Sequence, residues 1–126
     1  MNTQGMKSNV AILGASSKPE RYSYKALNLL LEKKFPVFPI HPALGEIEGI
    51  PVYEKLGDIE NPIDTVTVYV SPKFSAPLAE DFLKLKPRRV IFNPGTENPE
   101  LQRRLTEGGI EVEEACTLVL LQTGQF

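Results

Sequence analysis

The residues best suited to bind a ligand lie in a turn of small residues near the start of the chain. In order, the sequence there reads Val10-Ala11-Ile12-Leu13, Gly14-Ala15-Ser16-Ser17, and then Lys18-Pro19-Glu20-Arg21. Small side chains let a backbone approach an anion, and the amides at the start of a following helix point toward it. This order of strand, turn and helix predicts a phosphate site. The alternative is a tight β-to-α turn with solvated cations.

The same turn departs from the fingerprint of dinucleotide-binding domains. That pattern would place glycines at positions 16 and 19, where this chain has Ser16 and Pro19. The second predicted strand ends in Ile40-His41-Pro42, and no acid follows until Glu46, so the carboxylate that normally holds the ribose of NAD is missing. A phosphate ligand other than NAD is therefore expected. His41 is either a nucleotide contact or a polar strand end without chemistry.

Two further predicted strands end in short turns, at Val70-Ser71-Pro72 and at Asn93-Pro94-Gly95. Because the carboxyl ends of parallel strands meet at one edge of a sheet, these turns are expected to line the same crevice. Ordinary turn chemistry is the alternative for both. None of these turns carries a metal cluster or a nucleophile beside a base, so no catalytic residue is expected. Cys116 is expected to be a small buried apolar side chain, with a mixed disulfide to a thiol ligand as the alternative.

Length and composition restrict the class of protein. With 126 residues, 41% of them apolar and 24% charged, the chain fits one domain spanning residues 1–126, with Met1–Lys7 as a mobile start. No apolar run reaches the roughly 20 residues of a membrane span, and no secretory signal is evident, so a cytoplasmic, bacterial protein without a membrane partner is expected. A net charge of −2 argues against nucleic acid as a partner. The single Cys116 excludes an internal disulfide and a cysteine-based zinc site.

Apolar runs that predict strands alternate along the chain with stretches of helical periodicity. The predicted strands cover residues 8–14, 35–40, 63–70, 89–93 and 110–113, with a short edge strand at 51–53. The predicted helices are one capped by Ser23 and closed by Lys33 and Lys34, one over 74–85, one over 98–107, and a single turn at 54–58, while 115–126 is either a short amphipathic helix or an apolar tail. This alternation predicts a three-layer, Rossmann-like α/β domain whose mostly parallel sheet of five or six strands is flanked by helices.

These motifs, in this order, resemble the small stand-alone CoA-binding proteins, which are similar to the N-terminal CoA-binding domain of the succinyl-CoA synthetase α subunit. The residues that carry the resemblance are Gly14 to Ser16, Pro19 to Ser23, Phe38 to Pro42, Gly49 to Tyr53, Ile63-Asp64, Val70 to Pro72 and Asn93 to Asn98. The resemblance extends from about Asn9 to Cys116, which is nearly the whole chain.

The resemblance implies that CoA, or an acyl-CoA, lies across the strand ends of a Rossmann-like fold. It implies phosphate contacts from Gly14, Ala15, Ser16, Ser17, Lys18 and Arg21, nucleotide contacts from Ile40, His41 and Pro42, pocket walls from Ser71 and Pro72, and a pantetheine arm near Asn93, Pro94, Gly95 and Thr96. The family often has Asn-Pro where this chain has His41-Pro42. The synthetase subunit also has a second domain with a phosphorylated histidine. The matching stretch has no counterpart of it, so ligase activity is not expected.

The leading hypothesis is therefore a non-catalytic CoA-binding or regulatory module. Its alternatives are an NAD(P)-binding Rossmann protein and a small subunit of an acyl-CoA-metabolising enzyme. The apolar stretch Leu118-Val119-Leu120-Leu121 is expected to pack on the sheet, or to pair with a second copy or a partner enzyme.

Overall fold

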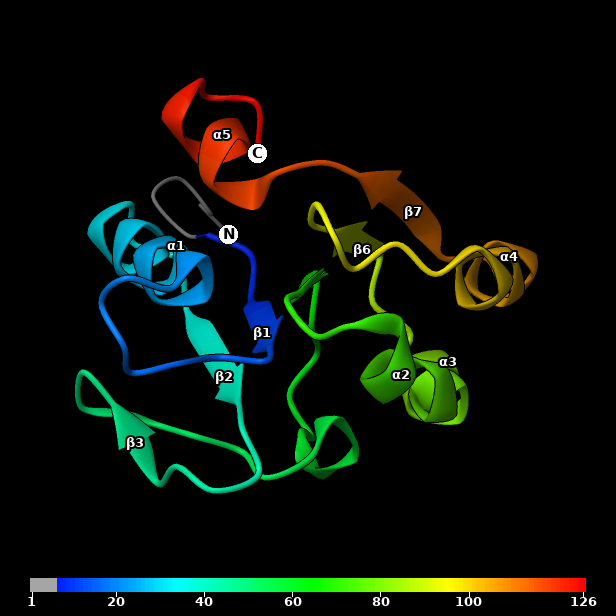
Figure 1. Ribbon diagram of the computed structural model, residues 1–126, viewed down its shortest axis with the longest axis horizontal. Coiled ribbons are helices and arrows are strands. Elements are labelled where there is room, and N and C mark those ends of the chain that lie inside the picture. Colours follow the sequence, from blue (N-terminus) through cyan, green and yellow to red (C-terminus); the bar gives the residue numbers. More distant parts are fainter. Residues whose placement is uncertain (1–6) are drawn as a thin grey trace, which may run out of the picture.

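The computed structural model describes residues 7–126 (Figure 1). Of the start predicted to be mobile, Met1–Lys7, all but Lys7 lies outside these residues. The strands are β1 (Val10–Leu13), β2 (Val37–Ile40), β3 (Glu46–Ile47), β4 (Ile50–Pro51), β5 (Thr65–Val68), β6 (Arg89–Phe92) and β7 (Glu111–Glu114). The α-helices are α1 (Tyr22–Glu32), α2 (Pro72–Ser75), α3 (Ala79–Leu85), α4 (Pro99–Glu107) and α5 (Thr117–Gln122), and the 3₁₀ turns are η1 (Leu56–Asp58) and η2 (Ala76–Leu78).

Five of these strands form one parallel sheet in the order β2-β1-β5-β6-β7. The chain passes from β1 outward to β2 and then returns to β5, on the other side of β1. The direction of strand order therefore reverses between β1 and β5, and the loops that leave the two strands diverge there. In open α/β sheets a ligand crevice forms at this point, at the carboxyl ends of the strands. The predicted Rossmann-like α/β fold is confirmed, with five strands in its main sheet.

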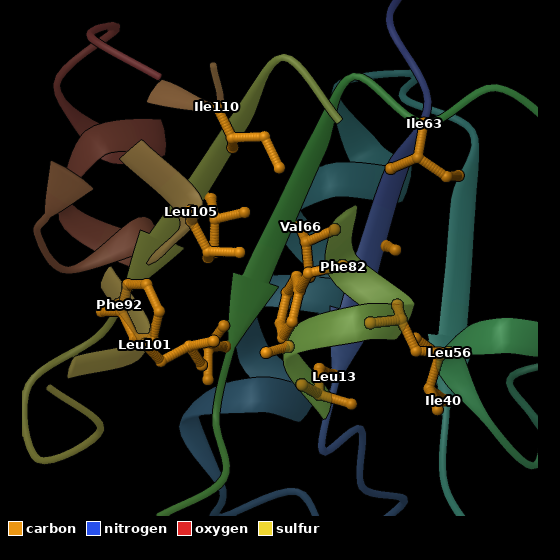
Figure 2. Packing of buried hydrophobic residues seen from close by; sticks show 14 of the residues in the cluster. Leu13, Ile40, Leu56, Ile63, Val66, Phe82, Phe92, Leu101, Leu105 and Ile110 are labelled. Carbon is orange, nitrogen blue, oxygen red and sulfur yellow. The ribbon is translucent and has the colours of Figure 1, made fainter. Parts of the chain in front are cut away.

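Helices cover both faces of the sheet (Figure 1), and each face has its own core. Successive residues of a strand point to opposite faces. In β1, Val10 and Ile12 accordingly pack with α1 and α5, while Ala11 and Leu13 pack on the side of α3 and α4. Figure 2 shows the second of these cores, where Phe82 lies fully buried against the sheet. Burial on both faces explains why the strands read as continuous apolar runs.

The predicted N-cap of the first long helix is wrong. Helix α1 begins at Tyr22, and its N-cap is Arg21, whose backbone is still extended and whose side chain makes no capping hydrogen bond. The backbone carbonyl of Lys18 accepts a hydrogen bond from the Arg21 amide at 3.0 Å, and this bond closes a turn just before the helix. Helical geometry therefore starts earlier than the apolar spacing indicated. Ser23 lies within the first helical turn, where it is buried.

The helix predicted over residues 74–85 is divided into α2, η2 and α3. Pro77 lies inside this stretch and has no amide hydrogen, so it cannot continue an α-helical hydrogen-bond ladder. The chain tightens into a 3₁₀ turn at Pro77 and then resumes as α3. As a result, Phe74 is on a separate short helix rather than on one long helix, and it is 62% exposed.

Two smaller differences concern the loop after β2 and the thiol. The stretch expected as a loop and edge strand forms a two-stranded antiparallel hairpin of β3 and β4, and Tyr53 adds a single bridge to Ile40 at the edge of the main sheet. Cys116 is half-buried at the N-cap of α5 rather than a buried core residue. Within residues 7–126, no helix is long and apolar enough to cross a membrane.

Candidate functional site

The turn after β1 depends on the close approach of Gly14 to β5. Gly14 has a φ of +91°, a conformation that L side chains rarely adopt, and a β-carbon there would lie 2.7 Å from Cγ1 of Val70. The amides of Gly14 and Ala15 both donate to the carbonyl of Ile40, at 3.2 and 3.0 Å. The turn is thus hydrogen-bonded to the end of β2 on one side and packs closely against the residues that follow β5 on the other. Of the turn predicted to approach an anion, the amides of Gly14 and Ala15 are therefore already engaged by Ile40.

The groups that remain free to meet an anion lie slightly further along the chain. Helix α1 has no side-chain cap and no acidic residue in its first turn, so the positive end of its dipole faces outward unneutralised. Lys18 and Arg21 are both exposed there, and neither pairs with a carboxylate within the residues described. The hydroxyl of Ser16 accepts the Lys18 amide at 3.0 Å, which holds the turn in shape. This corner of the molecule is built to attract negative charge.

A cavity of about 620 Å³ opens in front of this corner, between the ends of β1, β2 and β5. Its volume is in the range typical of ligand pockets. Among the predicted site residues it is lined by Gly14, Ala15, Ser16, Lys18, Arg21, His41, Pro42 and Ser71. Val70, expected at this crevice as part of the turn after its strand, lines it as well, and the lining residues that were not predicted are Glu20, Tyr22, Ser23, Tyr69 and Phe74. With Lys18 and Arg21 against the single carboxylate of Glu20, the lining has a net positive charge.

A second, apolar cavity of about 230 Å³ continues the first one on the side of η1 and α3. The two cavities share the lining residues Gly14, Pro42, Val70 and Phe74, so they lie side by side, and together they are called the groove, with a cationic end and an apolar end. The remaining lining residues of the apolar end are Leu13, Ile40, Glu54, Lys55, Leu56, Leu78 and Asp81. The predicted site residue Ile40 belongs to this end.

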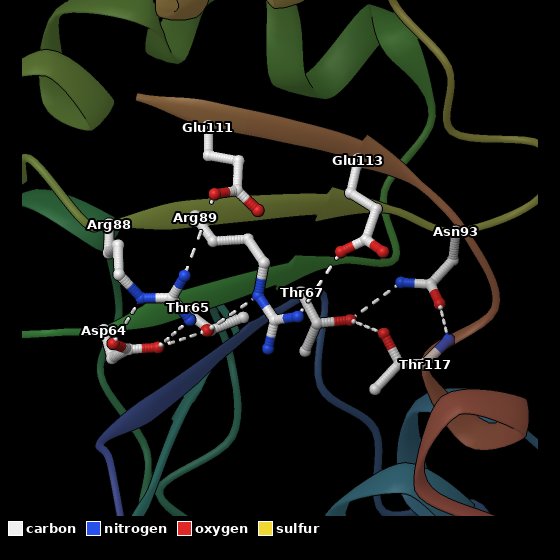
Figure 3. Close-up of polar contacts among 9 residues, drawn as sticks. All are labelled: Asp64, Thr65, Thr67, Arg88, Arg89, Asn93, Glu111, Glu113 and Thr117. Atoms are coloured by element: carbon white, nitrogen blue, oxygen red, sulfur yellow. Dashed lines mark hydrogen bonds and ion pairs between the residues drawn. The ribbon is translucent and has the colours of Figure 1, made fainter. Parts of the chain in front are cut away.

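Six predicted residues line neither cavity, and they are Ser17, Pro72, Asn93, Pro94, Gly95 and Thr96. Asn93 is buried, and its side chain is fully engaged (Figure 3). Its Nδ2 donates to Oγ1 of Thr67 at 2.7 Å and to the Val68 carbonyl at 2.8 Å, while its Oδ1 accepts the Thr117 amide at 2.8 Å. The side chain of Asn93 therefore links the end of β6 to β5 and to the start of α5. These hydrogen bonds fix the position of the loop that follows β6.

The loop after β6 is fixed by its own polar groups. The Thr96 hydroxyl donates to the carbonyl of Asn93 at 2.7 Å, and the Gly95 amide donates to the Glu97 carboxylate at 2.9 Å. Ser17 and Pro72, by contrast, are exposed next to the groove residues Lys18 and Ser71.

His41 shapes the loop that leaves β2. Its Nδ1 accepts the amides of Ala43 at 2.9 Å and Leu44 at 3.2 Å, and its own amide donates to Tyr53. An Nδ1 that accepts two amides carries no proton, so the imidazole presents Nε2–H as a donor. Within residues 7–126 no carboxylate is hydrogen-bonded to this ring. The ring can donate a hydrogen bond to a ligand, but it is not arranged as a general base.

Tyr69 adds a buried phenol to the wall of the cavity. Its hydroxyl is buried, and no described residue reaches it with hydrogen-bond geometry. This burial raises the pKa of Tyr69 to about 12, so the phenol stays protonated at neutral pH. Cys116 lies outside both cavities, and within residues 7–126 no group of His, Cys, Asp or Glu side chains could hold a metal ion.

A parallel α/β sheet with a cationic groove at its switch point defines a Rossmann-like domain. The model of the CoA-binding domain family matches residues 8–122 of the chain. The protein therefore belongs to the CoA-binding domain family, and the predicted family resemblance is confirmed.

The relatives include both stand-alone proteins and one part of a larger enzyme. The chain is 27% identical over 100 residues to the uncharacterised protein YneT of Bacillus subtilis, covering 79% of this chain and 74% of that protein. It is 33% identical over 104 residues to an ADP-forming acetate–CoA ligase of Methanocaldococcus jannaschii, covering 79% of this chain but only 15% of the ligase. A crystal structure of an uncharacterised protein matches with a TM-score of 0.89 and 41% identity, over 95% of this chain and 98% of that one.

Proposed function

We propose that this protein binds CoA or an acyl-CoA in the groove at the carboxyl ends of β1, β2 and β5, as a non-catalytic binding or regulatory module. The observation that carries the proposal is the cationic end of the groove. There, among residues 7–126, Lys18 and Arg21 form no ion pair beside the uncapped start of α1, in a chain of the CoA-binding domain family. CoA carries a diphosphate and a ribose phosphate, and cations beside the start of a helix can bind these negative charges.

In this arrangement the phosphates meet Lys18, Arg21 and the first amides of α1, with the exposed Ser17 hydroxyl beside them. Gly14, Ala15 and Ser16 supply the close backbone wall rather than a full set of free donors. The Nε2–H of His41 is the donor available to the nucleotide part, flanked by Ile40 and Pro42.

The pantetheine arm would leave along the neighbouring strand ends. Ser71 and Pro72 form the near wall, and the loop of Pro94, Gly95 and Thr96 lies beyond it on the same edge of the sheet. Asn93 supports this path as a positioning residue, because its own polar atoms are already hydrogen-bonded within the protein.

The chemistry of the lining favours binding over catalysis. The Nδ1 of His41 is engaged by two amides, the Tyr69 phenol is held protonated by burial, and the Cys116 thiol lies outside the groove. The alternative, a small subunit of an acyl-CoA-metabolising enzyme, is favoured by the similarity to one part of an acetate–CoA ligase. In that case Val119, 51% exposed on α5, offers an apolar contact to a partner enzyme or a second copy. The single cysteine fits the cytoplasmic location that we propose.

Calorimetric titration with CoA, NAD and ATP, each added separately, tests the proposal. We expect saturable binding of CoA and weaker or no binding of NAD. Binding of NAD without CoA would overturn the proposal and favour the dinucleotide alternative. Incubation with acetyl-CoA separates a binding module from an enzyme, because a module leaves the thioester intact and an acyl-CoA enzyme consumes it.

A further inference from the structure

Three large apolar side chains are markedly exposed in the part of the chain that the structure describes. They are Tyr22 at 64%, Phe74 at 62% and Val119 at 51%. Two of them, Tyr22 and Phe74, line the same cationic cavity, whereas Val119 lies away from it on α5. Exposed aromatic rings at the mouth of a pocket are typical of ligand contacts.

Phe74 occupies the junction between the two ends of the groove. It lines the cationic cavity together with Lys18 and Arg21, and it also lines the apolar cavity together with Leu13 and Leu56. Tyr22 lines only the cationic end. A ligand whose phosphates sit at the cationic end and whose apolar group enters the second cavity would pass the residues that both cavities share, and Phe74 is the only aromatic one among these four.

The backbone beneath the ring is held in place. The amides of Phe74 and Ser75 both donate to the carbonyl of Ser71, at 2.9 and 3.1 Å. Ser75 is fully buried, and its hydroxyl accepts a hydrogen bond from Asn98 at 3.1 Å. The ammonium of Lys73 lies 5.9 Å from the centre of the Phe74 ring, so a positive charge accompanies the ring. The ring of Phe74 is thus exposed, while the backbone that carries it is held by hydrogen bonds.

We propose that Phe74 stacks on the purine of the ligand and is the residue by which this groove selects a purine-containing ligand. This inference rests on the proposed binding of CoA. The purine has two aromatic faces that stack well on a phenyl ring, whereas the pantetheine arm has no ring to stack. The apolar cavity beside Phe74 is large enough for part of a heterocycle, and the carboxylates of Glu54 and Asp81 on its lining could accept hydrogen bonds from an amino group.

The test compares three ligands, which are CoA, adenosine 3′,5′-bisphosphate and 4′-phosphopantetheine. In Phe74→Leu, which keeps an apolar side chain, we expect affinity for CoA and for the bisphosphate to fall by about 5- to 150-fold, the range of base–aromatic stacking. Affinity for 4′-phosphopantetheine should not change. Phe74→Tyr keeps a ring and should retain the binding of all three ligands.

A second readout reports on the ring itself. The chain contains no tryptophan, so Phe74→Trp introduces a single indole at the proposed stacking position. CoA and the bisphosphate should quench its fluorescence, and 4′-phosphopantetheine should not. Val119→Trp carries its indole on α5 outside the groove and serves as the control, with no quenching expected.

The outcomes separate this inference from the proposed function. If the unaltered protein does not bind CoA, the proposed function is wrong and the inference falls with it. If CoA binds but Phe74→Leu binds it as tightly as the unaltered protein, only the role of Phe74 is wrong. Loss of purine affinity in Tyr22→Leu but not in Phe74→Leu would also overturn it, because the stacking ring would then be Tyr22.

Discussion

Gly14 and Val70 approach so closely that a β-carbon on Gly14 would lie 2.7 Å from Cγ1 of Val70. The first turn of the domain is therefore set by two elements far apart in sequence. Val70 follows β5, and the carbonyl of Ile40 at the end of β2 accepts both amides of the turn. The cationic corner keeps its shape because the turn cannot move away from either strand.

Gly14→Ala should lower both stability and CoA affinity. The new methyl group would clash with Val70, and the backbone of the alanine would have to keep a positive φ. We therefore expect a loss of about 2–4 kcal/mol in the free energy of unfolding. Gly95→Ala is the matched control, since Gly95 has the same φ of +91° but nothing within 4 Å of its added β-carbon. It should lose only about 1–2 kcal/mol. Equal losses in urea denaturation would show that the contact with Val70 does not matter.

Arg21→Ala should weaken CoA binding by about 1–3 kcal/mol, because a charge-assisted hydrogen bond to phosphate is lost while the fold is unaffected. The weakened variant should also depend less on salt than the unaltered protein. Arg103→Ala removes another exposed arginine, on α4, where within residues 7–126 it forms an ion pair with Glu107 alone. That control should bind CoA normally. Unchanged affinity in Arg21→Ala, measured by calorimetry, would remove Arg21 from the site.

Asn93→Ala should destabilise the fold by about 2–4 kcal/mol. The substitution leaves the Thr117 amide and the Val68 carbonyl without their side-chain partner in a buried setting. Asn61 is exposed and lies outside this network, so Asn61→Ala should change the free energy of unfolding by less than about 0.5 kcal/mol. Denaturation of the two variants side by side measures the difference. A loss below 1 kcal/mol for Asn93→Ala would contradict the structural role of its side chain.

The ion pair between Asp64 and Arg88 predicts a modest dependence of stability on pH. Partial burial opposes ionisation of Asp64, but hydrogen bonds from Arg88 and Thr65 outweigh it and lower the pKa of this carboxyl below its ordinary value. Since the folded state binds the proton less readily, this stabilisation is present above the ordinary pKa of about 4 and is lost as the pH falls through the lowered value.

Arg88 is more than half exposed, so solvent screening limits this contribution to about 1 kcal/mol or less. Asp64→Asn should therefore reduce stability slightly at pH 7 and should flatten the acid limb of the stability profile. An acid limb that is identical in the two proteins would show that Asp64 is not responsible for it.

The sequence predicted the alternation of elements and more than half of the lining of the cationic cavity, and it did so for physical reasons. Strands such as β1 and β5 are buried on both faces, so their apolar runs are continuous and easy to identify. The small residue Gly14 and the cations Lys18 and Arg21 are the sequence features from which an anion site was predicted, and all three line the cationic cavity.

What could not be predicted depends on contacts between distant segments. The engagement of the Ala15 amide requires Ile40 to lie beside it, and the burial of Asn93 requires α5 to close over β6. Phe74 was included in one helix over residues 74–85 because its spacing to Leu78 is helical. The break at Pro77 instead leaves Phe74 on a separate short helix, exposed at the groove. A proline within the periodic stretch was the signal that could have revealed this exposed ring.

The location of the ligand tests the account most directly. A ¹H–¹⁵N correlation spectrum of the protein should be recorded during titration with CoA. We expect saturable shifts of the amides of Lys18, Tyr22 and Ser71, at the cationic end of the groove, with the amides of α4 unmoved. Saturable shifts confined to α4 and β7, or the absence of any saturable shift, would contradict a CoA site at the turn after β1.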